Sequence, residues 1–110
     1  MDKTQIFYTF VWGDEAGYAY GHAFIKSPFF IHFDDTIEAC RVQTKNLISE
    51  AWVFKITSKH QNSIQRMQDH LENKFGMHHY SNFPLETEND ELPTWLPLED
   101  LMKTYQILND

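Results

Sequence analysis

The residues of this chain that could do chemistry are one thiol, Cys40, and six histidines. A cysteine thiolate attacks carbonyl carbons, and a neighbouring imidazole lowers the thiol pKa and carries the proton. His22 lies in an alternating aromatic stretch, where an imidazole can act as a general base. The sequence therefore offers Cys40 with His22 or His32 as a catalytic pair. The alternative is structural, because a lone cysteine beside Ala39 and Val42 is typical of a small buried side chain.

The other histidines raise the question of a metal site. His78 and His79 are adjacent, and His60 and His70 precede them in the chain. Zinc sites need ligands at defined spacing, usually with cysteine or carboxylate partners, and no second motif completes such a set here. A glycine-rich phosphate loop and a dinucleotide fingerprint are also missing from the sequence. We expect no metal and no cofactor.

Acidic residues gather near the C-terminus, in the run ETENDE over residues 86–91. Most charge runs are simply solvated, but such a run can also meet a basic patch on a partner. Trp95 follows it, and an exposed Trp95 or Trp12 would supply the aromatic anchor that protein interfaces prefer. The predicted partner-binding residues are Glu86, Glu88, Asp90, Glu91 and Trp95.

Composition limits the class of protein. The chain has 110 residues, of which 42% are hydrophobic, so we expect one domain, residues 1–110, with its own core. Nine basic residues stand against sixteen acidic ones, a formal charge of -7, which argues against sequence-independent binding to nucleic acid. A single cysteine fits a reducing compartment, and no apolar run is long enough to be a signal peptide or a membrane span. We expect a cytoplasmic protein.

Apolar residues alternate with other residues in several short stretches, which is typical of strands. Residues 6–12 and 18–25 show this period of two on either side of a glycine-bearing turn, so we expect a hairpin. Residues 29–33 and 52–57 are predicted to form two further strands. Residues 37–44 fit either a short strand or a helical turn.

The period changes after Ser58, which forms a capping-box pattern with Gln61. Apolar residues recur at helical spacing from Ile64 to Phe75, and Gly76 is placed where a helix would end. A loop over residues 77–84 and a second helix that begins near Pro97 follow. The sequence thus predicts an α+β fold, with a mostly antiparallel sheet of four to five strands and two helices packed on it.

Several local strings resemble the permuted papain-like hydrolases of the NlpC type. In that family a strand carries the histidine, and residues 21–25 (GHAFI) resemble its histidine string. Residues 30–33 with 37–39, and later 52–56, resemble the strands that follow. The helix that ends at Gly76 and the loop over residues 80–83 resemble the next elements. The resemblance covers about three quarters of the chain and implies a papain-like fold.

The resemblance stops at the nucleophile of the family. The family's cysteine opens the last helix, where this chain has residues 94–97 (TWLP), with neither cysteine nor serine. If the fold is papain-like, the resemblance implies a degenerate form that has lost this chemistry and serves as a binder, since fold does not imply function.

Two functions from different classes follow from these features. The first is a small, acidic, non-catalytic interaction protein of the inhibitor type, like immunity proteins, antitoxins and phage anti-defence proteins, that binds and blocks a protein target. Its negative charge would speed encounter with a basic target. The alternative is a papain-like cysteine hydrolase or amidase that uses Cys40 and His22. A structural or virion component is a third class that the sequence leaves open.

Overall fold

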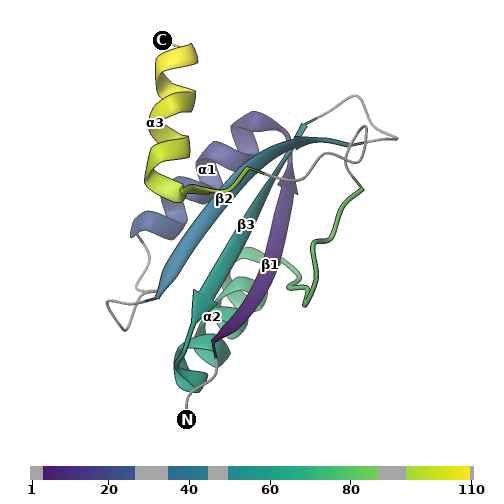
Figure 1. Cartoon of the computed structure of the whole chain (residues 1–110), viewed down its shortest axis with the longest axis vertical. Coiled ribbons are helices and arrows are strands. Elements are labelled where there is room, and N and C mark those ends of the chain that lie inside the picture. Colours follow the sequence, from purple (N-terminus) through teal and green to yellow (C-terminus); the bar gives the residue numbers. More distant parts are fainter. Residues whose placement is uncertain (1–3, 27–34, 45–49, 87–93, 110) are drawn as a thin grey trace.

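The structure is a computed structural model, and it describes residues 4–26, 35–44, 50–86 and 94–109 (Figure 1). The elements in chain order are β1 (Gln5–Trp12), α1 (Asp14–Lys26), β2 (Thr36–Gln43), β3 (Glu50–Ser58), α2 (Gln61–Phe75), β4 (Leu96–Pro97) and α3 (Leu98–Asn109). Within these residues the four strands form one antiparallel sheet in the order β1-β3-β2-β4. The prediction of an α+β fold on an antiparallel sheet is confirmed, but the described residues form three helices and not two.

Strand β3 is the centre of the sheet, and its alternation separates two cores. Trp52, Phe54 and Ile56 belong to one hydrophobic cluster, whereas Ala51 and Val53 belong to another. Because successive side chains of a strand point to opposite faces, the two clusters lie on the two faces of the sheet. The near-continuous apolar run of β3 is what a strand buried on both faces requires.

The first face, here called the helix face, is covered by all three helices. Figure 1 shows α1 and α2 behind the sheet and α3 beside α1. Rings from the helices meet rings from the strands there: the centroids of Phe24 on α1 and Phe54 on β3 are 4.8 Å apart, edge to face. This cluster holds the buried residues Phe7, Phe24, Ile37, Ala39, Trp52, Phe54, Ile56, Ile64, Met67, Leu71, Met77, Leu98, Leu101 and Met102.

The second face, here called the loop face, has a smaller core. Its buried residues are Cys40, Val42, Ala51 and Val53. Partly buried side chains pack against them, two from β1 and three from the segments on either side of residues 87–93: Tyr8, Phe10, Phe83, Leu85 and Trp95. In the part of the chain that the structure describes, no helix covers this face.

The predicted strand over residues 18–25 is wrong, because these residues belong to helix α1. Gly13, at φ 89°, turns the chain after β1, and two acidic residues in the first turn suit the positive end of the helix. Gly17, Gly21 and Phe24 are buried, and their spacing of four and three residues is that of one helix face. The alternation of Tyr18 with Tyr20 therefore does not mark a strand.

The two glycines let α1 lie close to its neighbours. A Cβ at position 17 would overlap the indole of Trp52. At position 21 it would lie 3.1 Å from Sδ of Met102 and 3.3 Å from Cδ1 of Leu98, both on α3. Packing against the sheet and α3 thus decides the conformation of a segment whose local pattern indicates a strand.

The structure also bears on the other predicted strands. Residues 52–57 do form a strand, as part of β3, and the ambiguous residues 37–44 lie in the strand β2 and the residue after it. The predicted strand over residues 29–33 lies outside the described residues.

The helix that ends at Gly76 is confirmed as α2, and the second predicted helix as α3. Gly76 has φ 63°, and the next N–H, of Met77, donates to the carbonyl of Leu71 over 3.0 Å. The predicted capping box is wrong, because the N-cap residue is His60 and its side chain makes no cap hydrogen bond. Ser58 instead accepts a hydrogen bond from the His60 N–H and donates one to Asp35.

Candidate functional site

The structure does not bring Cys40 and His22 together, and His32 lies outside the described residues. Cys40 is 2% exposed in the core of the loop face, whereas His22 is exposed on α1, which packs on the helix face. The sheet therefore lies between the thiol and the imidazole. His22 instead stacks on Tyr18, with ring centroids 6.2 Å apart. Burial raises the pKa of the Cys40 thiol to about 12, against smaller lowering effects of Lys55 and of a hydrogen bond with Val53.

The predicted partner-binding residues have different surroundings. Glu86 is exposed, whereas Glu88, Asp90 and Glu91 lie outside the described residues. Trp95 is half-buried on the loop face, with its ring centroid 5.9 Å from that of Tyr8. Nζ of Lys55 lies 5.0 Å from the centroid of its ring. Trp95 therefore packs over the sheet and leaves only part of its ring for a partner.

The described histidines do not assemble into a metal site. Within residues 4–26, 35–44, 50–86 and 94–109, no group of three or more histidine, cysteine or acidic residues is placed to hold a metal ion. His79 pairs with Glu72, with Nδ1 3.1 Å from Oε1. His70 packs against the ring of Phe75, and burial, together with the charge of Lys74, lowers its pKa.

A charged network at the start of α1 has a structural role. Asp14 accepts hydrogen bonds from Nε and Nη2 of Arg41, at 3.0 and 2.8 Å, and from Nε1 of Trp52 at 2.8 Å. Nη2 of Arg41 also lies 2.9 Å from Oε2 of Glu50. Burial lowers the pKa of Arg41, but the bonds and charges of Asp14 and Glu50 outweigh it and raise the pKa. The network fixes the first turn of α1 against the sheet.

Large aromatic side chains are exposed at the outer side of β1. Trp12 is 42% exposed and Tyr80 is 37% exposed, and the ring of Phe10 lies between them. The centroid of Phe10 is 5.5 Å from that of Trp12 and 5.8 Å from that of Tyr80. We call these three residues the edge patch. Exposed aromatic clusters of this kind are typical of binding sites.

A cavity of about 330 Å³ adjoins the edge patch and is here called the edge cavity. Its walls come from β1, α1 and the C-terminal end of α2, and from the segment that follows α2. None of its lining residues is acidic, and none is lysine or arginine: Phe10, Val11, Trp12, Tyr20, Phe75, Gly76, Met77, His78 and Tyr80. Such a lining suits an apolar group.

The backbone of β1 is open at the same place. Tyr8 and Tyr80 exchange two backbone hydrogen bonds of 2.8 Å, so the polar groups of Tyr8 point away from β3. Alternation along a strand directs those of Phe10 and Trp12 the same way. Among the described residues, no outward backbone hydrogen bond of Phe10 or Trp12 is formed. Figure 1 shows the segment after α2 running along this side of the sheet.

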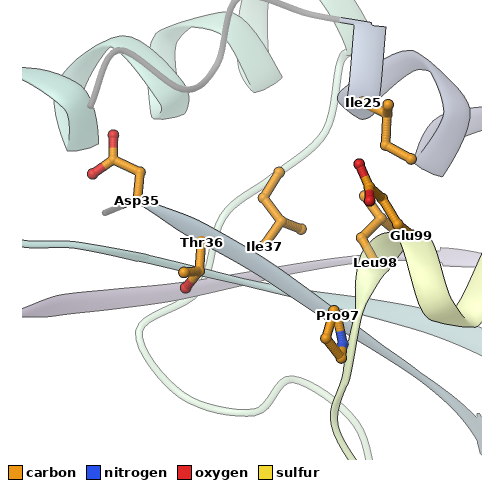
Figure 2. A pocket seen from close by; sticks show the side chains of 7 residues that line it. All are labelled: Ile25, Asp35, Thr36, Ile37, Pro97, Leu98 and Glu99. Atoms are coloured by element: carbon orange, nitrogen blue, oxygen red, sulfur yellow. The ribbon is translucent and has the colours of Figure 1, made fainter. Parts of the chain in front are cut away.

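A second cavity, of about 290 Å³, lies between the end of α1 and the start of α3 (Figure 2). Ile25, Ile37, Pro97 and Leu98 give it an apolar lining. Figure 2 shows the carboxylates of Asp35 and Glu99 on opposite sides of Ile37. Asp35 is buried and bonded to Ser58, so Glu99 is the exposed carboxylate at this cavity. An alkyl chain that ends in a cation would suit these surroundings.

The edge patch could be found from the sequence only in part. Trp12 was one of two tryptophans named as a candidate anchor, and it is the more exposed one. Phe10 and Tyr80 were missed, because the predicted hairpin partner over residues 18–25 would have paired with β1. Since those residues form a helix, the outer edge of β1 has no such partner.

Comparison with known proteins gives no relative from which a function could be taken. No model of a protein family, no curated protein and no solved structure matches this chain. The helices in the described residues include none with the length and apolarity needed to cross a membrane.

Proposed function

We propose that this chain is a small, acidic, non-catalytic interaction protein that binds and blocks a protein target in the cytoplasm. Immunity proteins, antitoxins and phage anti-defence proteins are the classes it is most like in size and charge. The observation that carries the proposal is the edge patch, where Trp12 and Tyr80 are more than one third exposed beside a mostly apolar cavity.

Aromatic side chains are the usual anchors of protein interfaces, because they bury a large area while few rotatable bonds are fixed. Trp12 and Tyr80 meet this requirement from a supported position, since both pack near Phe10 on the sheet. Trp95 contributes less in this proposal, because much of its ring already packs on Tyr8 and Phe83.

Charge indicates the kind of target. The chain has a formal charge of -7, and the exposed Glu86 begins its acidic run. A basic target would be attracted at long range, which raises the association rate more than the final affinity. We therefore propose a basic protein as the target and assign no direct role in binding nucleic acid or membranes.

The hydrolase alternative would need Cys40 and His22 to meet, and they lie on opposite sides of the sheet. Residues 21–25, which resemble the histidine strand of the NlpC-type hydrolases, are helical here. A degenerate papain-like scaffold stays a prediction that none of the comparisons bears on. The geometry gives no support to a second function.

The proposal is tested by capture of partners from a lysate of the native host, using the whole chain as bait at moderate salt. Trp12→Ala combined with Tyr80→Ala removes two rings of the edge patch. Ile6→Ala is the matched control, because Ile6 is 44% exposed on β1 but belongs neither to the patch nor to the lining of either cavity. We expect one stoichiometric basic protein that the wild type and the control retain and the double variant loses. Circular dichroism confirms that all three fold.

A second measurement separates charge from contact. Reversal of Glu86, Glu88, Asp90 and Glu91 to lysine should slow association with the captured target and weaken its salt dependence. An unchanged rate would remove the electrostatic part of the proposal. Equal capture by the wild type and the double variant would remove the edge patch from it, and the lack of any stoichiometric partner would overturn it.

A further inference from the structure

We propose that the target binds by adding a strand to the outer edge of β1 and placing one uncharged side chain in the edge cavity. This inference rests on the proposed function and names the form of the target segment that the edge patch accepts.

The backbone of β1 supports the addition of a strand. An edge strand presents N–H and C=O groups that a further strand can pair with. The bridge between Tyr8 and Tyr80 shows that this edge already accepts extended chain in the antiparallel sense. Among the described residues that pairing stops at Tyr8, so Phe10 and Trp12 offer the next outward groups. A helical segment keeps its backbone bonds to itself and could not use them.

Side-chain alternation decides which face each residue of an added strand points to. In an added strand, the residues opposite Phe10 and Trp12 point to the loop face, beside those two rings. The residue opposite Val11 points to the helix face, where Tyr20 and Phe75 line the cavity and meet edge to face at 5.7 Å. One side chain of the target segment therefore faces the edge cavity.

The chemistry of that side chain follows from the lining. The lining is mostly aromatic and aliphatic and holds no acidic residue, lysine or arginine. A charge placed in the cavity would have only His78, the Trp12 indole and the tyrosine hydroxyls as polar side-chain neighbours, and burying a charge without a full set of partners is costly. Its volume of about 330 Å³ is at the lower end of the range for ligand pockets. It suits one aliphatic or aromatic side chain, and the basic residues of the target then lie outside the paired stretch.

A second copy of this chain fits the edge less well than a target segment. Its own β1 has the groups of Tyr8 already paired with Tyr80, so only the stretch from Phe10 to Trp12 could join. It would also bring a second charge of -7 to the contact. We therefore assign the edge to an extended segment of a different protein.

The test uses the whole chain and a displayed library of short, random linear peptides as the probe. We expect the selected peptides to share an apolar residue flanked by residues of strand preference. In hydrogen-exchange measurements on the peptide complex, the amides of Phe10 and Trp12 should exchange about tenfold more slowly than in the free protein, while that of Ile6 is unchanged.

A pair of variants isolates the backbone contribution. Trp12→Ala removes the ring, and Trp12→Pro removes the ring together with an N–H that points away from β3. We expect Trp12→Pro to bind the selected peptide about tenfold more weakly than Trp12→Ala, because one hydrogen bond is lost. Both variants are first checked for folding by circular dichroism. The exchange measurement uses the wild type, so it decides the matter even where Trp12→Pro does not fold.

Equal binding by the two folded variants, or peptides that bind without slowing the two amides, would overturn the inference. A library that yields no binder would also overturn it. So would slow exchange of these amides in the free protein if it appears together with dimerisation, because a second copy would then occupy the edge. A host target that needs Trp12 and Tyr80 but leaves these amides unprotected would overturn strand addition and leave the proposed function standing. Peptides that protect the amides, without any host target, would support strand addition and overturn the proposed function.

Discussion

On the helix face of the sheet, three helices bury large side chains such as Trp52 and Phe54, which are 0% exposed. On the loop face, the buried residues are small, Cys40 and Ala51 among them, and half-buried rings such as that of Trp95 lie over them. The same three strands β1, β2 and β3 serve both faces. The free energy of burial scales with apolar area, so most of the stability comes from the helix face.

The two faces of the sheet therefore have different roles, one in stability and one in binding. The helix face holds the fold together and has little left to offer a partner. The loop face and the neighbouring edge of β1 have partly exposed rings that contribute less to folding and are available for binding, with Phe10 shared between the core of that face and the edge patch. Changes on the two faces should therefore affect stability unequally.

Truncation of a ring should cost more on the helix face than on the loop face. Phe54→Ala leaves a cavity between α1 and β3, and we expect it to lower the free energy of unfolding by about 3–5 kcal/mol. Trp95→Ala removes a larger ring from a half-buried site, and its cost should stay below about 2 kcal/mol. Urea denaturation measures both values. Equal losses would mean that the loop face stabilises the fold as much as the helix face does.

The close approach of α1 to the sheet predicts an unusual effect of alanine. Gly17→Ala improves the helix propensity by about 1 kcal/mol, but the new methyl group would overlap Trp52, so we expect a net loss of about 1–3 kcal/mol. Ala19→Gly, at an exposed position of the same helix, should lose about 1 kcal/mol from propensity alone. A stabilising Gly17→Ala, measured by thermal unfolding, would contradict the packing of α1 on Trp52.

The thiol on the loop face predicts a dependence on pH. Burial raises the pKa of Cys40 from 9.0 to about 12, so the folded chain holds this proton where the unfolded chain has lost it. The resulting stabilisation is complete below pH 9.0 and is lost as the pH rises towards 12, by about 1.4 kcal/mol per unit. Stability measured against Cys40→Ala, which lacks the thiol, isolates this loss. A constant difference between the two proteins would show that folding does not raise the pKa of the thiol.

The same burial predicts that alkylation of Cys40 is slow. Near pH 8 the thiolate fraction in the folded chain should be about a thousandfold lower than in the unfolded chain, because burial raises the pKa from 9.0 to about 12. The labelling rate should fall with it, because only the thiolate reacts. Iodoacetamide labelling with and without urea measures the ratio. Rapid labelling of the folded protein that depends on His22 would instead favour the hydrolase alternative.

The edge patch should have the smallest effect on folding. Trp12→Ala removes a ring that is 42% exposed, so we expect a loss of at most about 1 kcal/mol, mostly from its contact with Phe10. Thermal unfolding measures the loss, and Ile25→Ala, also exposed, gives the reference for an ordinary surface truncation. A loss as large as that of Phe54→Ala would make Trp12 a core residue and weaken its assignment to binding.

Part of the fold could be predicted from local patterns. The helical spacing from Ile64 to Phe75 with Gly76 behind it predicts α2, and the apolar run from Trp52 predicts β3, and both are present. These patterns are reliable because the whole segment carries one period. Residues 18–25 carry two patterns at once, an aromatic alternation and a spacing of Gly17, Gly21 and Phe24 that fits a helix.

The catalytic hypothesis depended on that uncertain segment. In α1, His22 is exposed on the side of the sheet that the helices cover, whereas Cys40 is buried on the loop face. The side chain of His22 therefore has different neighbours in a helix than it would have in a strand.

The sequence by itself determined the α+β class, the strand β3, the helices α2 and α3 and the acidic character of this protein, because composition and single-period patterns are local properties of the chain. Only the tertiary structure decided that α1 is a helix, that the sheet lies between Cys40 and His22, and that no described segment pairs with the outer edge of β1 at Phe10 and Trp12. The physical reason is that each of these depends on a contact between distant segments. The packing of Gly17 on Trp52 decides the first, and the partner that β1 receives in the sheet decides the last.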